Sequence, residues 1–344
     1  MSTNSETLDF QDESQEQQKE IIEKDFIPHF LPTYRVKSSL YPLPIIIAIL
    51  FAGVLAYLTF FVAGVQVEGS YFPEDQYGVL GVVLNGVIFT VIAAVSAFTI
   101  IFLMRKLGVG VLKYIFGLSF GFVSFFITLM FLDVIIFLIF VQIPETIFLI
   151  NFYYLFTNIF VPISTAIFVF LIIFYYFTSK SIKIKNIIVL YISLLVSASM
   201  SIILPFWSTL AILIGISLWD IFAVLYKRGP IKTMIDIVSI NNDENGLSKA
   251  EAEEKIRKGE RVYDTSKLEI GIGDLAFYSL LTSSVLLFTN NFLIVILVSA
   301  AILIGTGITI SGLKRNKILP GLPISIFMGI GTFAIYQLIV TFFI

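Results

Sequence analysis

The sequence has no cysteine and a single histidine, His29, among its 344 residues. Without cysteine the chain can form no disulfide and has no thiolate nucleophile, and it gives no indication of redox compartment. With one histidine, a zinc site built on histidine ligands is not expected, and His29 is interpreted as a solvated residue near the membrane interface. We therefore predict neither a bound metal nor a cofactor.

Charged residues are also scarce, at 13% of the chain, whereas 58% of the residues are hydrophobic. This apolar content is far above that of a soluble domain, and it predicts an integral membrane protein in contact with the lipid bilayer. The formal net charge of −2 gives no reason to expect a nucleic-acid partner. Residues 1–25 contain no apolar core, so we expect no cleavable signal peptide.

Several apolar runs reach the roughly 17–25 residues that a helix needs to cross a bilayer. We expect an all-α polytopic protein with nine transmembrane helices. A turn at Pro205 is expected to separate the fifth span from the sixth. The spans are predicted at 44–65, 79–104, 114–141, 147–178, 187–205, 207–226, 271–289, 292–311 and 320–343.

The basic residues predict an orientation. When nine spans are threaded alternately, all 22 Lys and Arg residues fall on the side of the N-terminus. The opposite side receives only the acids Glu68, Glu74, Asp75 and Glu145. By the positive-inside rule, the N-terminus is expected in the cytoplasm and the C-terminus outside. The cell membrane is the expected location.

This threading divides the chain into four parts. We expect a largely disordered cytoplasmic tail at 1–43, six spans within 44–226, a cytoplasmic loop at 227–270 and three spans within 271–344.

Three short elements are predicted inside the loop. Residues 231–240 can form an amphipathic surface helix, and 247–260 read as a soluble helix with capping-box spacing at its start. Residues 261–270 alternate as a strand does.

Three acids lie inside apolar spans, namely Asp133, Asp220 and Asp274. Each would cost roughly 2.5–3.5 kcal/mol at a span centre, so each requires a reason. Asp220 precedes Lys227, and Asp274 follows Lys267, by a distance of about 10 Å along a helix. These two acids are therefore expected at similar depth, near the cytoplasmic side. Asp133 lies nearer the outer face and is interpreted as a solvated or hydrogen-bonded acid, with a role along a substrate path as the alternative.

Two facing carboxylates in a low-dielectric site cannot both ionise cheaply, so one is expected to keep its proton. Such a pair combines a general acid with a general base. The charged member can take a proton from a water while the other protonates a substrate carbonyl, which is how a carboxylate pair hydrolyses a peptide bond. Asp220 and Asp274 are the candidates for this chemistry.

Glycine and proline surround the predicted pair. Gly271 and Gly273 remove two side chains just ahead of Asp274, so a backbone or a water can approach. The stretch LPGLPISI, at 319–326, begins the last span at the same cytoplasmic edge, and its prolines predict an irregular first turn with free carbonyls. Elsewhere, the small residues at 305–312, with Gly329 and Gly331, are expected to let helices pack closely.

The same features also fit a proton-coupled transporter or channel, with the acids as a relay. Transporters of this kind often repeat their broken helices at corresponding positions in two halves. The breaks near 271 and 320 do not fall at such positions. We therefore favour hydrolysis over transport.

Three stretches resemble the signatures of the presenilin-type GxGD intramembrane aspartyl proteases. They are SLWDIFAVLYKRGPIKTMIDI, EIGIGDLAFYSLL and LPGLPISI, in the family's order and on the predicted sixth, seventh and ninth spans. The cytoplasmic N-terminus favours presenilins over signal peptide peptidases, which resemble them in inverted orientation. The composition suggests a microbial, archaeal homologue.

The resemblance implies that Asp220 and Asp274 form the catalytic pair, and that Pro320, Gly321 and Leu322 correspond to a Pro-Ala-Leu element that shapes the site and holds substrate. Gly321 departs from the usual alanine. Trp219 departs from the usual tyrosine.

The family's substrates are transmembrane helices of other proteins, which must unwind before they are cut. The strand-like 261–270 segment is a candidate edge for pairing with the unwound segment. The resemblance also raises a homo-oligomer, accessory subunits and self-cleavage of the 227–270 loop as open alternatives.

Overall fold

The computed structural model describes residues 32–344, apart from 68, 109, 145, 180, 227–228, 231–232, 234–266, 315–319 and 344. His29, the helix predicted at 247–260 and, except for Thr233, the helix predicted at 231–240 lie outside the described residues.

Within the described residues, nine helical spans are long and apolar enough to cross a membrane, which confirms the predicted all-α polytopic fold. The first span combines α2 (Pro42–Tyr57) with the short turns η1 (Ser38–Leu40) and η2 (Leu58–Val62), and the fourth combines α5 (Ile147–Leu155), η3 (Phe156–Phe160) and α6 (Val161–Thr178). The other seven are α3 (Glu74–Leu107), α4 (Val111–Phe140), α7 (Ile182–Ile203), α8 (Phe206–Leu225), α11 (Ile272–Thr289), α12 (Phe292–Lys314) and α13 (Gly321–Phe343).

The turn predicted between the fifth and sixth spans is present. Helix α7 ends at Ile203, and Pro205 is the N-cap of α8. Because proline has no N–H to donate and its ring clashes with the preceding turn, the chain stops and restarts here. One long apolar stretch is thereby divided into two helices.

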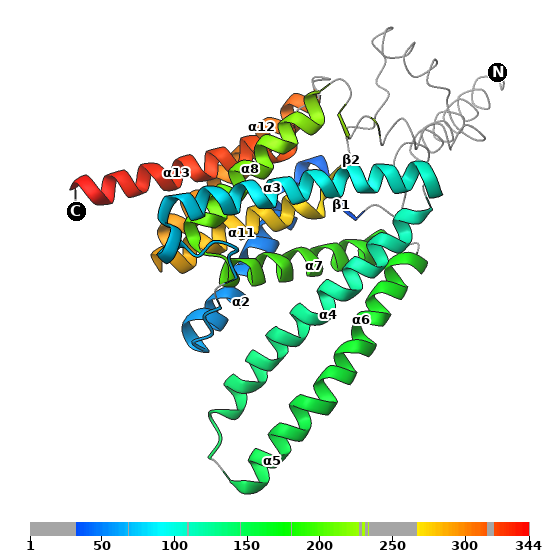
Figure 1. The fold of residues 1–344 in the computed structure, drawn as a ribbon, viewed down its shortest axis with the longest axis vertical. Coiled ribbons are helices and arrows are strands. Elements are labelled where there is room, and N and C mark those ends of the chain that lie inside the picture. The colour runs from blue at the N-terminus through cyan, green and yellow to red at the C-terminus, as the bar shows by residue number, and fades with distance from the viewer. Residues whose placement is uncertain are drawn as a thin grey trace, which may run out of the picture.

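Helix α11 is the centre of the bundle and lies in its middle in Figure 1. It packs against α7, α2, α12, α13 and α8. Most of its residues from Leu275 to Leu286 are buried, including five that carry a hydroxyl group. The helices around it present small side chains: Ala48, Ala52 and Ala56 on α2 are all fully buried. Small residues at this spacing let helix backbones approach closely.

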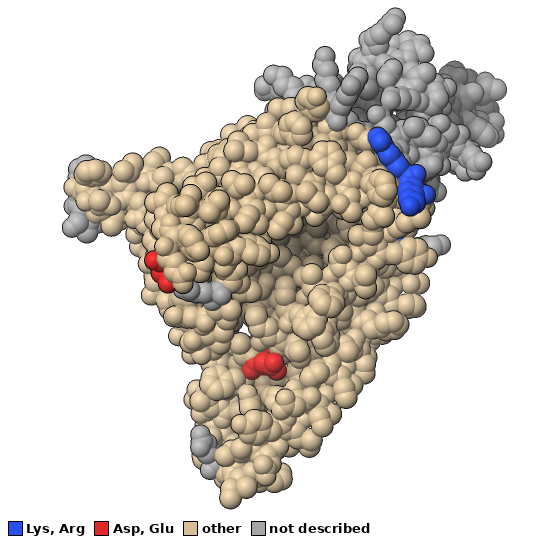
Figure 2. Space-filling view, in the orientation of Figure 1, with Lys and Arg blue, Asp and Glu red and all other residues tan. Residues whose placement is uncertain are grey.

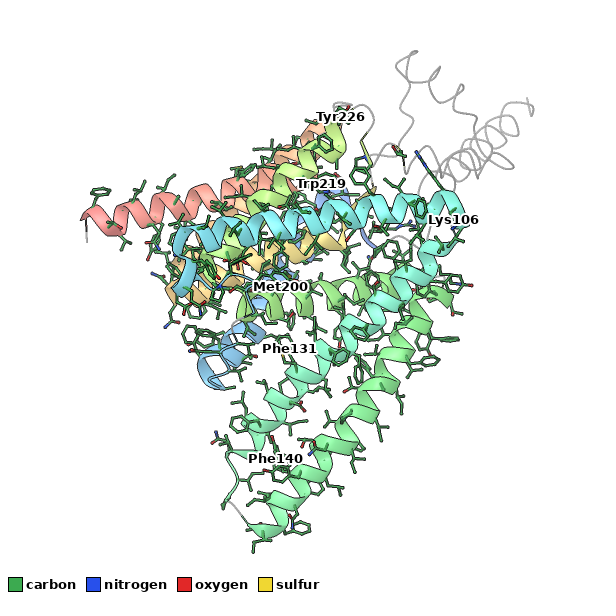
Figure 3. All side chains as sticks on the ribbon, viewed as in Figure 1. Lys106, Phe131, Phe140, Met200, Trp219 and Tyr226 are labelled. Atoms are coloured by element: carbon green, nitrogen blue, oxygen red, sulfur yellow. The ribbon has the colours of Figure 1, made fainter. Side chains whose placement is uncertain are left out.

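Helices α4, α5 and α6 diverge from the other helices and form a long hairpin (Figure 1). Phe131 on α4 joins this hairpin to the bundle, because it packs in a cluster with Ala52 and Ala56 of α2 and with residues of α7. Further along, the hairpin is held by ring contacts such as that of Phe140 with Tyr153, whose ring centroids lie 5.2 Å apart. Figure 3 shows Phe131 beside the bundle and Phe140 far from it.

Two glycines confirm the predicted close packing, and one does not. A Cβ atom at Gly305 of α12 would lie 2.6 Å from the Ser325 Cα of α13, and one at Gly329 would lie 2.7 Å from Leu281 Cδ2. At Gly331 a Cβ would meet nothing within 4 Å, so the expectation of a close contact there is wrong. Gly305 thus sets how near α12 lies to α13.

The charges visible in Figure 2 are few and well separated. Helix α3 illustrates this, with Glu74 and Asp75 in its first turn and Arg105 and Lys106 in its last. This separation is consistent with the positive-inside rule. The orientation of the termini stays a prediction.

A small antiparallel sheet lies at the beginning of α11. Strand β1 (Thr33–Lys37) pairs with β2 (Lys267–Gly271) over the whole length of both strands. β2 covers 267–270 of the strand predicted at 261–270 and continues for one residue to Gly271, whereas 261–266 lie outside the described residues. β1 was not foreseen, because it lies in the segment assigned to the N-terminal tail.

Candidate active site

Asp274 is the third residue of α11 and follows directly from β2. The N-cap, Gly271, has extended backbone angles (φ −63°, ψ 146°), and its N–H donates to the Asp274 carboxylate. This is the arrangement of an acidic residue that reaches back to cap its own helix. The helix dipole also favours a carboxylate in the first turn. The change from strand to helix therefore fixes where this carboxylate lies.

Of the two glycines just ahead of Asp274, only Gly271 borders the carboxylate. A Cβ at Gly271 would lie 3.6 Å from Asp274 Oδ2, and one at Gly273 would lie 3.7 Å from Phe277 Cε2. Both are ordinary contact distances, so neither glycine is demanded by crowding. Because Gly271 has no side chain, one side of the Asp274 carboxylate is left uncovered.

Asp220 lies on α8, in the second-to-last turn of the helix. Its Oδ2 accepts a long hydrogen bond, 3.4 Å, from the Leu322 N–H at the beginning of α13. The next residue back, Gly321, approaches the other acid, since a Cβ there would lie 3.4 Å from Asp274 Oδ2. One turn of backbone therefore donates to one carboxylate and passes beside the other.

The structure thus brings the predicted residues together. Asp220 comes from α8, Asp274 from α11 and the Pro320–Leu322 turn from α13, and the charges of the two acids lie close enough to interact. Pro320 and Leu322 are buried. The helix of α13 is regular from Gly321 onward, so the irregular first turn expected there is not present.

Sequence reasoning missed a fourth participant, Tyr278. Its hydroxyl donates to the Gly321 carbonyl at 3.1 Å, and its side chain is almost fully buried. Tyr278 lies one helical turn after Asp274, so both side chains project from the same face of α11. Nearby, Thr306 of α12 and Ser325 of α13 share a hydrogen bond of 3.0 Å. The spacing of four residues from Asp274 was the signal that could have identified the tyrosine.

Comparison with known proteins gives two matches. Residues 238–344 match the family model described as Presenilin. The chain is also similar to Presenilin-B of Dictyostelium discoideum, with 35% identity over 133 residues, which is 37% of this chain and 25% of that protein. Over residues 238–344 the chain is presenilin-like. It covers about a quarter of the length of the curated relative that it matches.

The matched family region contains two of the three parts of the candidate site. Asp274 and the Pro320–Leu322 turn lie within 238–344, whereas Asp220 lies before it. The assignment of Asp220 in this presenilin-like chain therefore depends on its own motif and on its contact with Leu322.

Trp219, beside Asp220, faces α3. Its ring contacts Phe98 with centroids 6.0 Å apart and Phe222 at 5.4 Å, and Tyr226 continues the row along α8. Figure 3 shows Trp219 where α8 meets α3. The indole thus has a packing role between α8 and α3.

Asp133 stays apart from the site. It lies on α4, which packs against α6, α7 and α3. Its Oδ1 is buried and has no hydrogen-bond partner among the described residues. The described part of the presenilin-like chain also contains no group of three His, Cys, Asp or Glu residues that could hold a metal ion.

Proposed function

We propose that this presenilin-like chain is an intramembrane aspartyl endopeptidase, in which Asp220 and Asp274 hydrolyse peptide bonds within transmembrane segments of other membrane proteins. The observation that carries the proposal is the Pro320–Leu322 turn, which lies against both acids at once. An aspartyl protease needs two carboxylates that act on one water, together with a backbone that can hold a substrate. This arrangement supplies all three groups from separate helices.

In the proposed mechanism, one carboxylate is ionised and the other keeps its proton. The ionised carboxylate takes a proton from a water between the two, and that water attacks the scissile carbonyl carbon. The protonated carboxyl donates its proton to the carbonyl oxygen, giving a neutral tetrahedral intermediate. The intermediate then collapses and its C–N bond breaks. The amine accepts the proton that the first carboxyl took from the water, and the second carboxylate takes a proton from a hydroxyl of the intermediate, so the starting protonation state returns.

The substrate must expose a peptide bond before this can occur, because a helix shields its own backbone. Gly271 supports the proposal, since a Cβ atom there would lie 3.6 Å from Asp274 Oδ2 and its absence leaves that side of the carboxylate open. β2 ends three residues before Asp274, so a substrate segment paired with its free edge would be directed toward the acids. Non-helical backbone at this depth is tolerated where protein surrounds it.

We place the enzyme in the cell membrane, with the 1–43 tail and the 227–270 loop in the cytoplasm. Its proposed partners are the substrate helices, and a homo-oligomer or accessory subunits remain compatible with the proposal. No contact in the described residues favours the transporter alternative.

The direct test is cleavage of a labelled transmembrane peptide by the purified protein in detergent. Asp220→Asn and Asp274→Asn are each expected to lower kcat by about 10²–10⁴-fold or more, because each removes one half of the acid–base pair. Asp133→Asn is the matched control, an intramembrane acid outside the site, and it should retain activity. All variants are first compared with the native protein by thermal unfolding. Cleavage that survives either of the first two substitutions overturns the proposed mechanism.

A further inference from the structure

Strand β1 lies about 230 residues before β2 in the sequence, yet it is fully paired with it. The register runs from Thr33 opposite Gly271 to Lys37 opposite Lys267. The ladder continues into the helix, because the N–H of Ile272 donates to the Pro32 carbonyl at 3.1 Å. Ile272 is the first residue of α11, and its N–H would otherwise be one of the donors left without a partner at a helix N-terminus. β1 therefore contacts the helix two residues before Asp274.

One face of this sheet packs against the apolar core, and the other carries polar contacts between the two strands. On one face, Ile270 is buried in the core of the bundle, with Tyr34, Val36 and Leu268 packed against it. On the other face, Arg35 Nε lies 2.7 Å from Glu269 Oε1, and the Thr33 hydroxyl donates to Glu269 Oε2 at 3.0 Å. The Arg35 and Glu269 side chains are 29% and 23% exposed, so the ion pair is partly shielded from water. Both faces hold β1 in place.

The outer edge of β1 is closed by α7. Asn186 accepts a hydrogen bond from the Arg35 N–H at 2.9 Å through Oδ1 and donates to the Arg35 carbonyl at 2.7 Å through Nδ2. The amide side chain thus bonds the strand as a neighbouring strand would. An exposed strand edge is a site for pairing with another chain, and at Arg35 that site is already occupied.

We propose that β1 is a permanent positioning strand of the active site, which holds the first turn of α11, and with it Asp274, against α7. This inference depends on the proposed protease function. It assigns positioning roles to Arg35, Glu269 and Asn186, none of which touches either acid. It also means that a substrate strand does not displace β1, and that pairing takes place on the other edge of β2.

A reversible lock tests whether β1 stays. Arg35 and Glu269 face each other across an antiparallel pair, where the Cα–Cα distance suits a disulfide. The native chain has no cysteine, so Arg35→Cys combined with Glu269→Cys can form a single defined bond. We expect the oxidised double variant to cleave at least as fast as its reduced form. If oxidation abolishes cleavage and reduction restores it, β1 must leave for catalysis and the proposal fails. Each single cysteine variant, oxidised alike, is the control.

Charge reversal tests whether β1 positions Asp274. Arg35→Glu and Glu269→Arg should each lower kcat about tenfold or more, with KM little changed, because small displacements of a reacting group are costly. The double reversal restores the ion pair in the opposite sense and should recover most of kcat. Lys37→Glu, on the same strand but away from Glu269, is the matched control. Single reversals that leave kcat unchanged would overturn the proposal.

A readout without substrate separates this inference from the protease function. Backbone amide exchange over 267–281 should be faster in each single reversal than in the native protein, and slow again in the double reversal. If the native protein cleaves nothing while exchange follows this pattern, the protease proposal fails and the positioning of α11 by β1 stands. Exchange that is the same in all four proteins refutes the positioning role.

Discussion

Helices α11 and α3 cross the same membrane but are built in opposite ways. In the most apolar 18-residue window of each, 61% of α11 is buried and only 11% of α3. Yet α11 is the least apolar of the nine spans found in the described residues, whereas α3 is among the most apolar. In lipid, apolar side chains suffice where a helix faces acyl chains, and polar ones must face protein. In α11, low hydropathy therefore accompanies a place in the interior of the bundle, beside the acids.

The largest expected effect is on stability, and it tests the contrast in burial by truncating one apolar side chain on α11 and one on α3. Leu281 of α11 is fully buried, and Val83 of α3 is half-exposed to the surroundings of the bundle. Leu281→Ala should lower the unfolding free energy by about 2–5 kcal/mol, because it leaves a cavity. Val83→Ala should change it little. Thermal unfolding in detergent compares the two, and equal losses would mean that burial does not distinguish these helices.

A second prediction concerns two glycines, Gly305 in α12 and Gly331 in α13. Gly305→Ala forces a Cβ to within 2.6 Å of the Ser325 Cα unless α12 and α13 separate. We expect about 1–3 kcal/mol of destabilisation from overpacking and a lower kcat, because α13 carries the turn that touches both acids. Gly331→Ala, which enters open space, is the control. If both variants unfold at the same temperature, the close approach at Gly305 does not matter for stability.

The smallest expected effect comes from removing one buried hydroxyl group of α11, that of Tyr278. Tyr278→Phe removes the hydroxyl that donates to the Gly321 carbonyl and should cost about 1 kcal/mol of stability. We expect kcat to fall while KM changes little, because the turn between the acids loses one anchor. Tyr336→Phe removes a comparable hydroxyl contact, to Asn291, and should leave kcat unchanged. A larger loss of kcat in Tyr336→Phe would contradict a specific role for Tyr278.

The sequence predicts the spans well because length and hydropathy are local properties. It also predicts which acids meet, since charge placement fixes the depth of Asp220 and Asp274, and spacing indicates their motifs. The partner of β2 could not be predicted in this way. β1 is short, lies next to a polar tail, and has a pairing partner 236 residues away, as the Thr33–Glu269 contact shows. Long-range pairing leaves no periodic signal in either segment.

Other features were missed for a related reason. The bonds of Asn186 to the backbone of Arg35 and of Tyr278 to the backbone of Gly321 depend on where a distant main chain lies. Amide and hydroxyl side chains occur in many positions, so their type alone indicates no partner. Gly331 illustrates the opposite error, since a small residue in a span was expected to mark a close contact and the structure places open space beside it.

The pairing of β1 with β2 also has a consequence in time. During synthesis β1 leaves the ribosome early, and Glu269 follows Thr33 by 236 residues, which at typical elongation rates takes roughly 10–50 s. Throughout that interval the first six helices can enter the membrane, but the strand waits without its partner and the second acid does not yet exist. The proposed active site is thus incomplete in a nascent chain until its seventh helix is made, so under the proposed function the membrane proteins synthesised beside it meet no active acid pair before then.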